Sequence, residues 1–215
     1  RAFGDDTRWP EIYQLNRARI GEDPDHLRAG QELLLREELT AAQLQRLLPS
    51  LPAAQVDSYT ALLNGAMAEF GITTRRRQVC FLAQLAHESG ELTAFEEHAS
   101  GAAYEGRCED LGNCEAGDGT RYKGRGPIQL TGKKNYRQAG QALGVDLVTW
   151  PELAAQAQVG FRVAAWFFRV NKLNQLADAG DFHEITQRIN GGQEGQRSRE
   201  GYLARACQVL AVACP

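Results

Sequence analysis

Residues 75–90 read RRRQVCFLAQLAHESG, and this stretch decides the fold. Its apolar side chains recur three and four residues apart, the spacing that gathers them on one face of an α-helix. Thr73 or Thr74 can cap the first turn, because a threonine hydroxyl accepts a hydrogen bond from the free amides there. The pattern predicts a helix over residues 75–87, with Glu88 at its end on the edge of the core. The apolar face consists of Val79, Leu82, Ala83, Leu85 and Ala86.

The chain on both sides of this helix also has a helical pattern. Thr40 and Gln43 form a capping box, and apolar residues at helical spacing run over residues 53–70 until Gly71 ends them. From Thr40 onward, only a short run near Gln129 is typical of a strand. The fold is therefore predicted to be mainly α. Further helices are predicted at residues 132–143, 158–170, 181–190 and 196–212.

Residues 1–36 differ in composition, being rich in Asp, Arg and Gly. A short helix signal begins at Trp9, a turn follows at residues 24–30, and Gln31–Leu35 are predicted to form a short strand. This order resembles the second half of a LysM wall-binding module. We predict a partial LysM-like segment over residues 1–36 and a main domain over residues 37–215.

The overall composition is that of a globular protein. The 215 residues are 43% hydrophobic and 24% charged, with a net charge of −3. Such a charge gives no general attraction to polyanions, so nucleic acid is not an expected partner. There is no run of 18 apolar residues and no signal-peptide pattern, so we expect a soluble monomer without membrane insertion.

The five cysteines are too few for a disulfide scaffold, and their odd number leaves at least one unpaired. Cys80 lies among apolar residues and is predicted to be a core residue. The pairs Cys108/Cys114 and Cys207/Cys214 could each close a short loop if the protein works outside the reducing cytosol. The sequence leaves open whether they do.

Glu88 and Glu97 are the candidate catalytic carboxyl groups. Hydrolysis of a glycosidic bond needs a carboxylic acid beside the leaving oxygen and a carboxylate on the opposite face. Glu88 ends an apolar helix, where partial loss of water favours the protonated form. Glu97 follows nine residues later. The alternative is that both are ordinary surface glutamates.

Several separated motifs together resemble the signature of glycoside hydrolase family 19. The resemblance runs from about residue 40 to 210, and its short loops are similar to those of the bacterial and phage endolysin branch. It implies a lysozyme-like multi-helix domain with a cleft and without a cofactor or metal. The motifs are His87–Gly90, Glu97, Gly117–Gly132, Asn135–Tyr136, Ile189–Gly192 and Arg199–Tyr202.

The resemblance also implies roles for single residues. Glu88 matches the general acid and Glu97 the second carboxylate, although Glu91 and Glu96 stand close to it. The family inverts, which implies carboxyl groups roughly 6.5 to 9.5 Å apart with water between them. Thr131 would hold that water, unless it and Asn190 serve only as helix-end residues. The expected substrate-binding residues are Tyr122, Gln129, Asn135 and Asn190. Apart from the resemblance, Arg199 and Glu194 have opposite charges and are expected to form an ion pair that organises the cleft; the alternative is an ordinary solvated surface pair.

The short loops and the LysM-like segment favour peptidoglycan as the glycan substrate, with chitin as the alternative. Action at a cell wall, in the periplasm or outside the cell, is expected. A non-catalytic wall-binding protein is a further alternative. A zinc peptidase is disfavoured because the four histidines are scattered. A cysteine peptidase using Cys80 or Cys114 lacks a motif.

Overall fold

The computed structural model describes residues 9–31, 33 and 37–215. The chain divides into two compact units, Arg1–Glu38 and Leu39–Pro215. The boundary predicted between residues 36 and 37 lies close to this division.

The first unit contains helix α1, Trp9–Ile20. The hydroxyl of Tyr13 donates to the backbone carbonyls of Gly21 (3.0 Å) and Glu22 (2.7 Å), which ties the chain back onto the helix after it ends. The predicted strand at Gln31–Leu35 falls largely outside the described residues. The LysM-like character of this segment stays a prediction.

The second unit is helical, and the helices predicted from apolar spacing are confirmed to within two residues at each end. The capping box of Thr40 with Gln43 is present, and Thr74 rather than Thr73 caps α4. In the described part of the chain, strand pairing is limited to isolated bridges of Arg125 with Glu96 and Leu130. The elements are α2 (Ala41–Leu47), α3 (Ala53–Glu69), α4 (Arg75–Glu88), η2 (Ala102–Tyr104), α5 (Cys108–Leu111), α6 (Asp118–Arg121), α7 (Lys133–Leu143), η3 (Pro151–Ala155), α8 (Ala157–Val170), α9 (Leu173–Ala179), α10 (Phe182–Asn190) and α11 (Gln196–Leu210).

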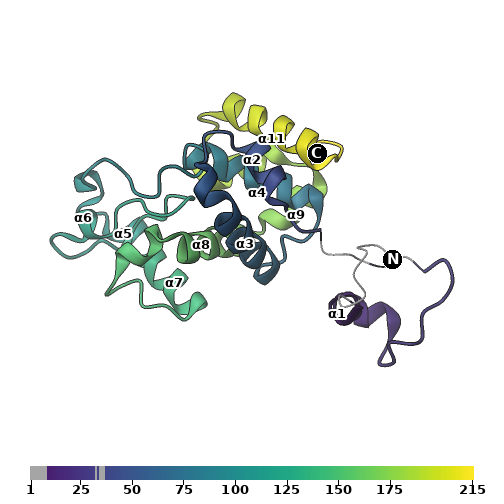
Figure 1. The fold of residues 1–215 in the computed structure, drawn as a ribbon. Helices are drawn as coiled ribbons and strands as arrows, with labels where there is room; N and C mark the ends of the chain where they lie inside the picture. The colour runs from purple at the N-terminus through teal and green to yellow at the C-terminus, as the bar shows by residue number, and fades with distance from the viewer. Residues whose placement is uncertain (1–8, 32, 34–36) are drawn as a thin grey trace. The chain divides into compact units, whose positions relative to one another are not determined.

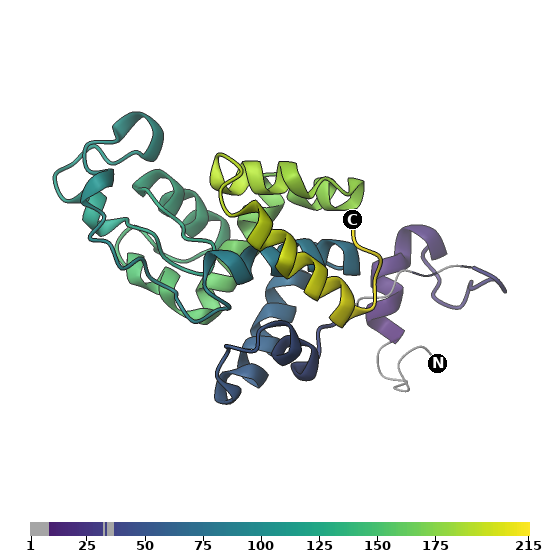
Figure 2. The ribbon, with the colours of Figure 1, turned by 90° about the horizontal axis from the view of Figure 1, so that it is seen from above.

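Helix α4 is the centre of this unit. Every residue from Gln78 to Ala86 is buried, so the helix has neighbours on all sides. Helix α11 packs along it, and α3 packs against α8 (Figures 1 and 2). Phe81 of α4 meets Phe168 of α8 edge to face, with ring centroids 5.3 Å apart. The predicted core position of Cys80 is confirmed, and burial raises the pKa of its thiol to about 12.

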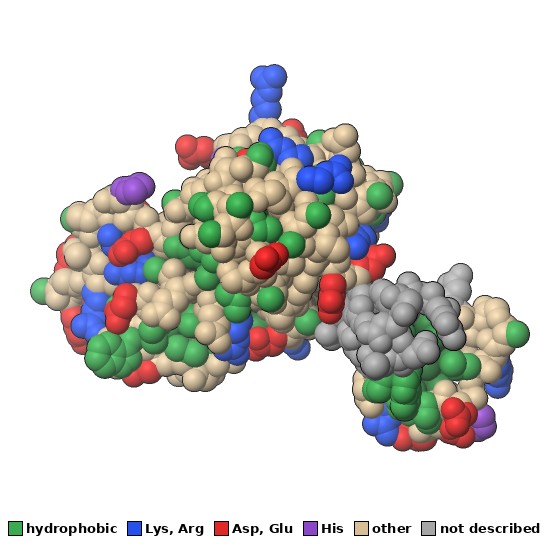
Figure 3. Space-filling view, viewed as in Figure 1, with side chains coloured by type: hydrophobic (Ala, Val, Ile, Leu, Met, Phe, Trp, Pro, Cys, Tyr) green, Lys and Arg blue, Asp and Glu red, His purple; other side chains and the backbone are tan. Residues whose placement is uncertain are grey.

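Helices α5, α6 and α7 lie together at one end of the unit (Figure 1). Both cysteine pairs that the sequence left open are disulfides, Cys108–Cys114 and Cys207–Cys214. The face in Figure 3 shows acidic and basic side chains interspersed, in keeping with the small net charge. Among the described helices, none has the length and apolar character needed to cross a membrane.

Candidate active site

Glu88 ends α4 and forms an ion pair with Arg199 of α11, with 2.6 Å between Oε1 and Nη2. Arg199 is 2% exposed, and the Glu88 side chain is 18% exposed. The guanidinium also donates to Oε1 of Gln84 (2.5 Å) and to the carbonyl of Glu194 (3.3 Å). Gln84 in turn donates to Thr186 at 2.9 Å. The Glu88 carboxylate is therefore held by a buried polar network, while its side chain stays partly exposed to solvent.

The predicted ion pair between Arg199 and Glu194 is wrong. The side chain of Glu194 is exposed, and its residue contributes a backbone carbonyl instead. Glu194 directly precedes Gly195, the N-cap of α11. Its carbonyl therefore lies about one helical turn before Arg199 and beside the guanidinium of that residue. Arg199 therefore acts on Glu88 directly.

His87 packs against the start of α11. Its Nδ1 lies 3.1 Å from the hydroxyl of Ser198. A side chain on Gly195 would place Cβ 2.5 Å from the imidazole ring, so this contact requires glycine. Burial and the nearby charge of Arg199 lower the pKa of His87, which favours a neutral imidazole beside Glu88.

Both oxygens of Glu97 accept hydrogen bonds from neutral donors. The hydroxyl of Tyr104 donates to Oε1 at 3.1 Å, and the amide of Gly124 donates to Oε2 at 3.0 Å. The Glu97 amide donates to the carbonyl of Gly124 at 2.9 Å. A Cβ on Gly124 would lie 2.8 Å from Oε1 of Gln129 and 3.1 Å from Oε2 of Glu97, so Gln129 borders the same carboxylate.

The neighbouring glutamates that competed with Glu97 have cationic partners. Glu96 pairs with Arg125 at 3.2 Å and with Lys123 at 3.3 Å. Glu91 pairs with Arg205 at 3.0 Å. The cations beside Glu91 and Glu96 stabilise their charged forms and make them weaker bases, whereas Glu97 accepts from the neutral donors Tyr104 and Gly124, which favours Glu97 as the carboxylate that takes a proton from water.

The chain between Glu88 and Glu97 is anchored along its length. The Ser89 hydroxyl donates to the carbonyl of Leu85 (2.6 Å) and accepts from the amide of Leu92 (2.9 Å). Leu92 is buried although its φ is +63°, a conformation that costs free energy for a branched residue and must be held by its surroundings. Phe95 meets Phe161 edge to face, with ring centroids 5.6 Å apart. These contacts hold the backbone that joins Glu88 to Glu97.

Two predicted polar residues, Gln129 and Thr131, lie on the turn ahead of α7, and a third, Asn135, lies in the first turn of that helix. Gln129 adopts φ +55°, and its side-chain nitrogen Nε2 donates to the carbonyl of Gly126 at 3.0 Å. The hydroxyl of Thr131 donates to the carbonyl of Gln129 at 2.9 Å, and Asn135 donates to the carbonyl of Thr131 at 2.7 Å. The N-cap of α7 is Gly132. The alternative interpretation of Thr131, as a residue that only caps this helix, is therefore wrong.

The other two predicted binding residues, Tyr122 and Asn190, are not part of this turn. Tyr122 is 2% exposed, its ring packs on Tyr136, and its hydroxyl donates to the carbonyl of Val148 at 3.0 Å. The prediction that Tyr122 lines a sugar-binding groove is wrong because the ring belongs to the core. Asn190 is exposed as the last residue of α10, and Gly191 ends the helix with φ +74°.

The site lacks the features of the peptidase alternatives. Cys80 is a buried thiol with a raised pKa, and Cys114 is oxidised in a disulfide, so neither can supply a thiolate nucleophile. In the part of the chain that the structure describes, no three His, Cys, Asp or Glu side chains gather as metal ligands.

A helical domain that presents two carboxyl groups anchored on a core helix and its following loop is the arrangement of a lysozyme-like glycoside hydrolase. The sequence profile described as Glyco_hydro_19, chitinase class I, matches residues 44–179. The chain belongs to glycoside hydrolase family 19.

Known proteins of this family are similar to the chain in sequence. An Arabidopsis thaliana endochitinase is 37% identical over 149 residues, which cover 66% of this chain and 50% of that protein. A glycosyl hydrolase family 19 domain-containing protein of Haemophilus influenzae is 30% identical over 174 residues, covering 67% of this chain and 84% of that one. The chain thus spans about half the length of the plant relative.

Solved structures show the same fold. A bacterial family 19 chitinase superposes with a TM-score of 0.67 at 27% identity, covering 81% of this chain and 95% of that one. Chitinase C of Streptomyces griseus superposes with a TM-score of 0.66 at 26% identity, covering 81% and 77%. The predicted lysozyme-like helical fold is confirmed.

Proposed function

We propose that the protein hydrolyses β-1,4 bonds in a wall polymer that contains N-acetylglucosamine, with Glu88 as acid and Glu97 as base. The observation that carries this proposal is the separate anchoring of the two carboxylates, Glu88 by buried Arg199 and Glu97 by Tyr104 and Gly124. Family membership supports it.

The reaction is a single displacement with inversion. Glu88 donates its proton to the glycosidic oxygen, while Glu97 removes a proton from a water on the opposite face of the sugar. Arg199 keeps the Glu88 carboxyl in place as it loses its proton. The hydroxyl of Thr131 and the amide of Gln129 lie on the turn beside Glu97, where they can orient the water and an N-acetyl group.

The glycan can be peptidoglycan or chitin. The short loops and the LysM-like segment support peptidoglycan, which carries peptide branches that an open site must admit. The names of the plant relative and of the structural neighbours support chitin. Two disulfides support action outside the reducing cytosol, at the wall itself.

The test compares wild type, Glu88→Gln and Glu97→Gln on purified peptidoglycan and on colloidal chitin. General acid–base groups contribute roughly 100- to 10,000-fold, so each variant is expected to lose at least about 100-fold in kcat. Glu96→Gln is the matched control, because it removes a neighbouring carboxylate that is already paired with cations.

The anomeric form of the first product is read by NMR before mutarotation. Formation of the α-anomer supports inversion, and formation of the β-anomer contradicts it. Full activity in Glu88→Gln would overturn the assignment of the acid. Binding without hydrolysis by the wild type would move the protein to the non-catalytic alternative.

A further inference from the structure

The loop that follows Glu97 returns to it through Tyr104. This tyrosine ends η2, and its half-buried hydroxyl donates to Oε1 of Glu97 at 3.1 Å. Burial and the hydrogen bond to Glu97 raise the pKa of Tyr104, so the phenol keeps its proton and remains a donor at neutral pH. A charged acceptor makes this a stronger bond than one between neutral groups.

The backbone of Tyr104 is held by Asn113. The Asn113 side chain is completely buried, and its Nδ2 donates to the carbonyl of Tyr104 at 2.9 Å. Its Oδ1 accepts from the amide of Lys133 at 2.9 Å, which fastens this loop to the start of α7. The disulfide between Cys108 and Cys114 closes the short segment that carries Asn113.

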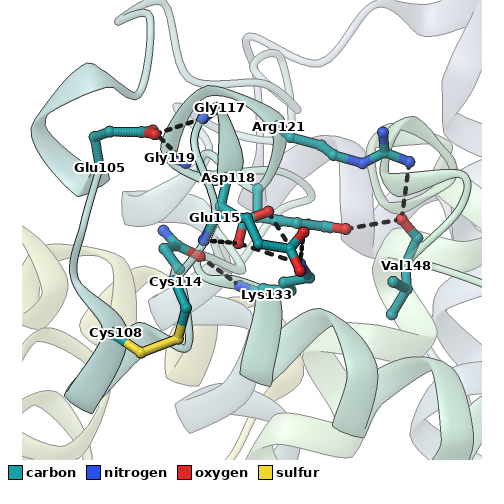
Figure 4. A network of polar contacts seen from close by, with 12 residues as sticks. Glu105, Cys108, Cys114, Glu115, Gly117, Asp118, Gly119, Arg121, Lys133 and Val148 are labelled. Atoms are coloured by element: carbon teal, nitrogen blue, oxygen red, sulfur yellow. Dashed lines mark hydrogen bonds and ion pairs between the residues drawn. A yellow bond between two sulfur atoms is a disulfide. The ribbon is translucent and has the colours of Figure 1, made fainter.

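A second set of contacts holds the residue next to Tyr104. The carboxylate of Glu105 accepts from the amides of Gly117 at 2.5 Å and Gly119 at 2.8 Å. Lys133 then pairs with buried Asp118 at 3.2 Å. Figure 4 shows Glu105 reaching these amides on one side of the network and Lys133 meeting Asp118 on the other.

We propose that Tyr104 is a positioning residue for Glu97, and that the Cys108–Cys114 disulfide keeps Tyr104 in place through Asn113. The loop thereby sets the direction in which the Glu97 carboxylate faces the attacking water. This inference rests on the proposed function, because it gives Glu97 the role of base.

The reason for expecting an effect on rate is geometric. Gly124 holds Oε2 of Glu97 from one side, so Tyr104 is the second point that fixes rotation of the carboxylate. A catalytic base displaced by about 1 Å can lower the rate about 100-fold, while the contacts that bind the sugar elsewhere are unchanged. The expected signature is a fall in kcat with KM preserved.

The first variant is Tyr104→Phe, which removes only the hydroxyl. A hydrogen bond to a charged group accounts for roughly a 10- to 100-fold change in kcat, and KM is expected to stay within about twofold. Tyr59→Phe is the matched control. This half-buried ring packs on Phe95 and Phe161, and in the described part of the chain it forms no hydrogen bond with Glu97. Its kcat is expected to equal that of wild type.

The second variant is Cys108→Ser with Cys114→Ser, compared with Cys207→Ser and Cys214→Ser. Both disulfides close loops of similar length, with sequence separations of 6 and 7, but only the first encloses Asn113. Loss of the first is expected to lower kcat by roughly tenfold with KM preserved, whereas loss of the second leaves kcat unchanged. Circular dichroism and thermal melting establish that each variant is folded.

The closing experiment combines Tyr104→Phe with the Cys108/Cys114 double substitution. If the disulfide acts through Tyr104, the combined variant has the kcat of Tyr104→Phe alone. If the fold-losses in kcat of the two separate variants multiply in the combined variant, the disulfide and Tyr104 act independently, and the proposed link between them is overturned. Wild-type kcat in Tyr104→Phe, with Glu97→Gln inactive, overturns this inference and leaves the proposed function standing. Full activity in Glu97→Gln, or no activity in the wild type, overturns both.

Discussion

The guanidinium of Arg199 is almost completely withdrawn from water and is bonded to oxygens of Glu88, Gln84 and Glu194. A buried charge of this kind is stable only while its partners are present, and the partners depend on it equally. The sequence showed an arginine in a family motif. It could not show which of several acidic residues it would meet, because Glu88 lies 111 positions away and Glu194 only five.

Arg199→Met is expected to lower the free energy of unfolding by roughly 3–5 kcal/mol, because Glu88 and Gln84 are left without their buried donor. It is also expected to reduce kcat strongly. Arg199→Lys keeps the charge but not the planar fork, so its stability loss is smaller while kcat still falls. Urea denaturation and initial rates measure both effects.

The control for this prediction is Arg162→Met. Arg162 pairs with Glu69 through two bonds of 2.7 Å, but both side chains are partly exposed. Its loss is expected to cost about 1 kcal/mol or less. Equal losses for the two arginines would contradict the importance assigned to burial.

At the scale of elements, the long helices could be predicted because many apolar positions fix each one. Helix α9 could not be predicted, because it has seven residues and only two of them, Leu173 and Ala177, are buried. Two apolar positions are too few to define a helical spacing. The buried position of Tyr122 was also missed, because Val148, whose carbonyl accepts the hydrogen bond from its hydroxyl, is 26 residues away. Tyr104 was overlooked although it lies in the glycine-rich loop after Glu97. An aromatic residue in such a loop was the available signal.

The turn after α4 is joined to two other elements by Glu91, which is 7% exposed. Its carboxylate accepts from the amide of Ser50 at 2.7 Å and pairs with Arg205 of α11 at 3.0 Å. Burial opposes ionisation, but the bonds from Ser50 and Arg205 outweigh it and hold the pKa of Glu91 below its usual value. A lowered pKa in the folded state stabilises the fold above the unfolded-state pKa and ceases to do so as pH falls.

Glu91→Gln is therefore expected to lower the free energy of unfolding by roughly 1–3 kcal/mol at pH 7. The difference from wild type should shrink as the pH falls from the unfolded-state pKa of a glutamate, about 4.3, through the lower pKa of folded Glu91. Thermal melting of both proteins at pH 7 and pH 3 measures this. A difference that is equal at both pH values would mean that packing, and not charge, accounts for the loss.

At the scale of the whole molecule, the second unit has its own starting anchor. Leu39 is 2% exposed, and Asn64 of α3 bonds to both its backbone amide (2.9 Å) and its carbonyl (2.8 Å). Thr40 then caps α2. All residues that hold Glu88 and Glu97 lie beyond this anchor. The family resemblance runs from about residue 40 to 210, within this unit of residues 39–215, whereas the LysM-like resemblance covers too few residues to define a fold.

Removal of residues 1–38 is accordingly expected to leave a folded unit whose melting temperature changes by less than about 2 °C, because its core and its first cap begin at Leu39 and Thr40. Its kcat on soluble N-acetylglucosamine oligomers should equal that of the full chain. On insoluble wall material the shortened protein should sediment less and act more slowly if the LysM-like segment binds glycan, since retention on the polymer raises the local enzyme concentration. Pull-down on peptidoglycan and on chitin, beside the oligomer assay, separates the two effects. Unchanged retention on both materials would show that residues 1–38 contribute no wall binding, and a large fall in melting temperature would show that the second unit depends on the first for its stability.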